Sequence, residues 1–184
     1  MSRFSSRLFG VLPVSQWLSV RGTTIRSVQR GTIAIAPASA SNTATITSVT
    51  VAHSRLRLLG YGISAASTND KLSARIVFTN ATTITAVVNT ATDVTVTVSF
   101  EVVEYWPGVV RSIQRGTVAG NTTATIGAVR TETSEVDWLG GSGSDANTNI
   151  TTVGRVTLTN ATTVTGTSAG GANDTIGFQV VEWV

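Results

Sequence analysis

The chain contains no cysteine, which excludes disulfide bonds, zinc–thiolate sites and thiol catalysis. It has a single histidine, and only 12% of its residues are charged. Thr, Val, Ala, Ser and Gly dominate the 184 residues instead, and no long window shows helical periodicity. This composition predicts an all-β protein whose surface carries hydroxyl groups rather than ions.

The most informative pattern is an internal repeat. Residues 73–85 return at 153–165 with the same arginine and the same Thr-Asn-Ala-Thr-Thr stretch. Residues 25–34 similarly return at 110–119, with Arg-Ser-Val-Gln-Arg-Gly-Thr matched by Arg-Ser-Ile-Gln-Arg-Gly-Thr. Such a match indicates an internal duplication. We therefore expect an N-terminal arm (1–22) and two β domains (23–106 and 107–184), joined at Pro107-Gly108.

Each copy is expected to form about six strands. In the first copy they are predicted near 25–34, with a bulge at Gly31, near 43–51 and 55–63, on both sides of a corner at Asn80, and at 94–105. In the second copy they are predicted near 110–119, 123–129 and 135–140, around the corner at Asn160, and at 175–183. Polar loops are expected at 64–70 and 141–149. Short strands without intervening helices predict tandem antiparallel β-sandwiches or small barrels.

The arm combines basic and apolar side chains. Seven arginines precede the first acidic residue, Asp70. A secretory signal is the alternative interpretation, but Pro13, Ser15 and Gln16 interrupt the apolar run and no small-x-small cleavage site follows. Exposed apolar groups of this size indicate a contact site. We expect the arm to anchor the protein to a partner through Arg3, Phe4, Arg7, Leu8, Phe9 and Trp17.

Catalytic and metal-binding patterns are weak. His53 has no counterpart in the second copy and no nucleophile-elbow sequence beside it. Glu101 and Glu104 are separated by an odd number of positions, so a regular strand places them on opposite faces. The loop around Asp145 lacks the ligand spacing of an EF-hand. We therefore expect neither an enzyme nor a cofactor.

Two repeated arginines leave a choice of roles. Arg30 and Arg115 each precede a glycine in the repeated opening of a copy. Phosphate binding is one interpretation, although no phosphate-binding loop is present. The favoured interpretation is a strand arginine that bonds a neighbouring strand or subunit.

The repeated openings, the two Thr-Asn-Ala-Thr-Thr stretches and the endings Phe-Glu-Val-Val-Glu-Tyr and Phe-Gln-Val-Val-Glu-Trp resemble a family of small virion- or tail-associated proteins of tailed bacteriophages. The resemblance covers residues 24–184 and not the arm. It implies a structural virion component, made in the host cytoplasm and located on the particle. It implies no catalytic residues.

Two functions of different classes are therefore expected. The first is a non-enzymatic structural protein displayed on the capsid (decoration protein or head fibre) or tail (fibre or adaptor) and held by the arm. The alternative is an adhesion module that binds a host surface carbohydrate or receptor through Tyr61, Trp106 and Trp138. Other virion proteins are the expected partners, without nucleic acid or a membrane span. The apolar last strand predicts a homo-oligomer, a trimer in particular, with Phe178, Val180 and Trp183 in its interface.

Overall fold

The structure of the protein is a computed structural model, which describes residues 24–64, 73–88, 93–143, 154–169 and 171–184. It confirms the all-β prediction, with antiparallel strands and no closed barrel. The strands of the first half are β1 (Ile25–Ile35), β2 (Ser41–Thr45), β3 (Ser54–Ile63), β4 (Arg75–Asn80), β5 (Thr83–Val87) and β6 (Val96–Tyr105). Those of the second half are β7 (Val110–Ala119), β8 (Thr123–Thr125), β9 (Ser134–Gly143), β10 (Arg155–Asn160), β11 (Thr163–Thr167) and β12 (Asp174–Trp183).

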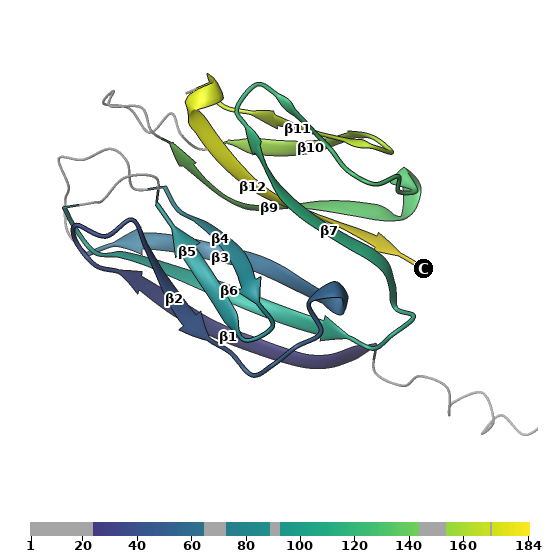
Figure 1. The fold of residues 1–184 in the computed structure, drawn as a ribbon, viewed down its shortest axis with the longest axis horizontal. Helices are drawn as coiled ribbons and strands as arrows, with labels where there is room; N and C mark the ends of the chain where they lie inside the picture. The colour runs from purple at the N-terminus through teal and green to yellow at the C-terminus, as the bar shows by residue number, and fades with distance from the viewer. Residues whose placement is uncertain (1–23, 65–72, 89–92, 144–153, 170) are drawn as a thin grey trace, which may run out of the picture.

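The strands pair in the same order in both halves. In the first half, the order is β1-β6-β3 in one sheet and β2-β5-β4 in the other. The second half pairs β7-β12-β9 and β8-β11-β10. Figure 1 shows the first half in purple to teal beside the second half in green to yellow. Each half is thus a two-layer β-sandwich, whereas its origin by duplication stays an inference from the sequence.

The alternation of apolar and polar residues decides which face of each sheet is buried. In β6, Val96, Val98, Phe100 and Val102 point into the first core, and they are almost completely buried. They pack there against Ile76 and residues of β1, β3 and β5. The second core is smaller and is built around Val118, Val164, Ile176, Phe178 and Val180.

The two Asn corners form as predicted. The Asn80 Oδ1 accepts hydrogen bonds from the backbone N–H of Thr82 at 2.8 Å and from its hydroxyl at 3.0 Å. Asn160 makes the same two bonds to Thr162. The side chain of each asparagine thereby holds the tight connection between two strands.

Three local predictions need correction. Gly31 is not at a bulge, because it pairs regularly with Phe100, and the register shift lies between Ile25 and Ser27 instead. A Cβ at Gly31 would lie 2.8 Å from the Phe100 ring, so the glycine makes room for that ring. The predicted second strands were too long, since β2 ends at Thr45 and β8 at Thr125. The third strand of the second half continues to Gly143, into the segment predicted as a loop.

Short 3₁₀ helices are the helical elements of the described residues. They are η2 (Val51–His53), η3 (Thr131–Thr133) and η4 (Gly171–Asn173). Within the part of the chain that the structure describes, no helix is long and apolar enough to cross a membrane.

Candidate functional site

The candidate site is the contact between the two halves, where several buried polar side chains form hydrogen bonds and ion pairs. The sheet β7-β12-β9 has its second-core face on one side, and its opposite face lies against the first half (Figure 1). Strand β12 is consequently buried on both faces along most of its length. One backbone pairing, between Arg75 of β4 and Gly140 of β9, joins the two halves into a six-stranded sheet.

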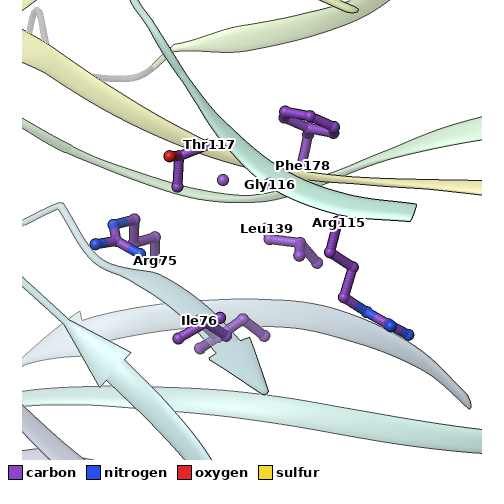
Figure 2. Close-up of a pocket in the computed structure, with 9 residues that line it drawn as sticks. Arg75, Ile76, Arg115, Gly116, Thr117, Leu139 and Phe178 are labelled. Atoms are coloured by element: carbon purple, nitrogen blue, oxygen red, sulfur yellow. The ribbon is translucent and has the colours of Figure 1, made fainter. Parts of the chain in front are cut away.

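Leu139 connects the two hydrophobic cores. It belongs to β9 of the second half, yet it packs in the core of the first half and is only 2% exposed. Figure 2 shows it between Arg75 and Arg115, on the side facing Ile76 of β4. The first sandwich is therefore completed by a residue of the second.

The backbone beside Leu139 depends on a glycine. Gly140 has φ of 99°, in the region that favours glycine. A Cβ there would lie 2.1 Å from the carbonyl oxygen of Ala74, so only a glycine lets β9 approach β4 this closely. This close approach allows the single pairing between the halves.

Arg115 is the central polar group of the contact. Its Nε donates to the Oε1 of Gln179 at 2.8 Å, and its terminal nitrogens donate to the carbonyl oxygens of Val51 and Ser54. The guanidinium also lies 5.0 Å from the ring centre of Phe78. Burial lowers the pKa of Arg115 to about 10, against the opposing effect of Asp137, so the group is still protonated at neutral pH.

Two further contacts cross the same boundary. Arg55 of β3 forms a bidentate pair with Asp137 of β9, at 2.6 and 2.8 Å, and a second ion pair with Glu135. The bond to Asp137 raises the pKa of Arg55 above its ordinary value. The amide of Gln179 bonds the backbone N–H and carbonyl of Leu56 at 3.1 and 3.2 Å. The side chains thus continue the hydrogen bonding of edge strand β3.

A cavity of about 190 Å³ lies in this contact. Arg75, Ile76, Arg115, Leu139 and Phe178 are among its lining residues. Figure 2 shows that they come from both halves and that the Phe178 ring points away from the others. Burial lowers the pKa of Arg75, whose Nε is buried without a hydrogen-bond partner in the structure. Most of the lining is apolar.

The sequence-predicted residues are placed as follows. The arm residues and Asp145 lie outside the described residues. Phe178 and Val180 are buried in the second core, at 2% and 0% exposure, and are covered within a single chain. Trp183 packs edge-to-face on Tyr105, with ring centres 5.3 Å apart, in a small cluster between the halves. The homotrimer itself stays a prediction.

The interpretation of the two arginines as structural is confirmed. Arg30 forms a 2.6 Å ion pair with Glu101 on the neighbouring strand, whereas Arg115 bonds the other half of the chain. Glu101 and Glu104 do lie on opposite faces of β6: the former pairs with Arg30 and Arg57, the latter with Arg26 and Thr50. They therefore do not share a site.

The candidate metal-binding and catalytic side chains that the structure describes do not lie together in one site. His53 lies half-buried in η2. Among the residues with described positions, no group of three or more His, Asp or Glu side chains could hold a metal ion. Sequence reasoning missed Leu139 and Gln179, because their burial comes from the other half of the chain and leaves no local pattern.

Glu104 and Glu182 are buried carboxylates with one role in each half. Glu104 accepts from the Thr50 backbone, from Ser27 and from Arg26, while Glu182 accepts from the Arg130 backbone and side chain and from Ser112. Burial alone would raise the pKa of both, but these donors outweigh it and hold both pKa values below the ordinary range.

The protein is expected to lose stability in acid for this reason. Because both folded-state pKa values are lowered, the stabilisation is fully present above the unfolded-state pKa of about 4.3 and is lost as the pH falls through the folded values. Urea unfolding between pH 7 and pH 3 measures the effect. The double variant Glu104→Gln, Glu182→Gln should be less stable at pH 7 and should lose less stability on acidification. An unchanged pH dependence in this variant would contradict the assignment.

The protein is therefore an all-β protein of two similar sandwiches, which are held together by hydrogen bonds and ion pairs between their side chains. Comparison of the chain with family models, curated proteins and solved structures finds no match.

Proposed function

We propose that the protein is a non-enzymatic structural component of a tailed-phage particle, displayed on the capsid or tail and anchored through residues 1–22. The observation that carries the proposal is that the buried polar side chains between the two halves bond one half to the other. Arg115, Gln179 and the Arg55–Asp137 pair all hold one part of the chain to another. Such an arrangement suits a rigid building block. The resemblance of the repeated motifs to virion proteins points in the same direction.

The anchoring role is tested by removing the arm. Deleting residues 2–20 is expected to leave the unfolding midpoint of the rest unchanged, while incorporation of the protein into purified particles falls at least about tenfold. Incorporation is measured by immunoblotting of gradient-purified particles. The double variant Phe4→Ala, Trp17→Ala at full length should reproduce much of the loss. Normal incorporation of the deleted chain would refute anchoring by the arm.

A surface aromatic supports a second candidate, the binding of carbohydrate. Trp106 is 48% exposed, and the Arg26 guanidinium lies 5.4 Å from its ring centre. Trp138, by contrast, packs against the second core, and Tyr61 packs against the first. Exposed indole rings stack on sugars through their apolar faces. Glycan-array binding by the full chain that is lost in Trp106→Ala would favour this function over a purely structural one.

A further inference from the structure

The contact between the two halves has an unused counterpart on the same chain. In the internal contact, one face of β7-β12-β9 covers the side of the first sandwich between its edge strands β3 and β4, and Leu139 enters the core there. Because the strand order is the same in both halves, the outer face of β1-β6-β3 is equivalent to that of β7-β12-β9. The side of the second sandwich between β9 and β10 is likewise equivalent to the side of the first between β3 and β4. The face left over is the part of β1-β6-β3 around Leu59, because Val103 and Tyr105 at the other end of that face already pack against the second half. The side left over lies between β9 and β10.

Leu59 is the counterpart of Leu139. Each leucine is the sixth residue of the third strand of its half. Each also precedes a glycine with positive φ, Gly60 at 139° and Gly140 at 99°. Leu139 is 2% exposed, whereas Leu59 is 51% exposed. A Cβ at Gly60 would meet nothing within 4 Å, in contrast to the crowding at Gly140. Leu59 therefore presents the same geometry without a partner.

The side between β9 and β10 is correspondingly open. Leu56 and Ile76 line the covered side of the first sandwich and are 0% and 1% exposed. Their counterparts, Val136 and Val156, are only partly buried, although both pack against the second core. The second core thus has apolar side chains that are only partly buried at the place where the first core is covered by Leu139.

The charges at the two places are complementary and reversed. Asp137 of the covering face pairs with Arg55 of the covered side in the internal contact. Their counterparts are Arg57, which pairs with Glu101 on its own face, and Glu135, which pairs with Arg55 at the margin of the internal contact; their side chains are still 51% and 52% exposed. Repeating the internal contact between two chains would bring Arg57 of one to Glu135 of the other. A carboxylate would again meet a guanidinium.

We propose that the Leu59 face of one chain docks on the open side between β9 and β10 of a second copy of the same chain. In this docked arrangement, Leu59 enters the second core and Arg57 pairs with Glu135. The contact is head-to-tail, so its repetition closes into a ring or extends into a filament according to the rotation between copies. This inference rests on the two halves of the chain and goes beyond the proposed function, since it holds whether or not the arm binds a particle.

A charge exchange tests the pairing. Arg57→Glu alone and Glu135→Arg alone each place like charges in the contact, and each is expected to weaken self-association at least about tenfold in sedimentation equilibrium. Each also removes an ion pair within the chain, with Glu101 or Arg55, so an unchanged circular dichroism spectrum and unfolding midpoint accompany the measurement. An equimolar mixture of the two variants should associate as the unmodified chain does, because each face then meets an opposite charge. Failure of the mixture to recover association would overturn the pairing.

The apolar contact is tested separately with Leu59→Asp, an exposed position that leaves the fold intact. It is expected to produce monomers with an unchanged circular dichroism spectrum. Val184→Asp, at a residue that is 75% exposed, is the matched control and should still associate. An unmodified chain that is monomeric throughout the micromolar range would overturn the proposal. Association lost on deleting residues 2–20 but retained in Leu59→Asp would do the same, by assigning the contact to the arm.

Discussion

Replacing Leu139 by alanine is expected to lower the free energy of unfolding by about 3 kcal/mol, the usual cost of emptying a leucine site in a well-packed core. The first half should be the part that is destabilised, because the Leu139 side chain packs in its core although the backbone of Leu139 belongs to the second half. Urea unfolding followed by tryptophan fluorescence and by circular dichroism measures both the size of the loss and its location.

Leu59→Ala is the matched control for this experiment. It removes the same side chain from the counterpart position, where the leucine is 51% exposed, and in dilute protein it should cost less than about 1 kcal/mol. Equal losses in the two variants would contradict the role of Leu139 as a core residue of the first half.

Replacing Arg115 by alanine is expected to destabilise the protein by about 3 kcal/mol. The substitution removes a buried guanidinium and its three hydrogen bonds, to the Gln179 side-chain oxygen and to the carbonyl oxygens of Val51 and Ser54. Arg115→Lys should recover only part of this, because a single ammonium group does not reproduce the geometry of the planar guanidinium fork. Denaturant unfolding at neutral pH provides the measurement.

Arg30→Ala is the control variant, since Arg30 occupies the repeated position in the first half. Its side chain is 67% exposed, and Glu101, although buried, keeps its second ion pair with Arg57, so the expected loss is less than about 1 kcal/mol. A loss from Arg30→Ala as large as that from Arg115→Ala would show that the contact between the halves is not what makes Arg115 important.

The sequence predicted much of the fold because the governing patterns are local. The alternation in β6 and the capping asparagines at 80 and 160 report strands and turns through neighbouring residues alone. Gly31 was misinterpreted because a glycine inside a strand fits either a bulge or a close approach, and the Phe100 ring that decides between them lies far along the chain.

The candidate site was harder to predict for a related reason. Leu59 and Leu139 stand in equivalent positions of two repeats, so their sequences give no sign that one is buried and the other exposed. Gln179 is 0% exposed and bonds the backbone of β3, a contact that no local pattern indicates. Such differences arise from the way two similar halves meet.

The position of Leu139 also affects how the chain folds during synthesis. Domains generally fold as units as they leave the ribosome, beginning with the N-terminal one. The first sandwich has all its strands once Tyr105 has emerged, but the residue that completes its core comes only with β9. The nascent first half therefore passes through a state with an open apolar side between β3 and β4. That interval is when the growing chain is most vulnerable to pairing with a neighbouring nascent copy.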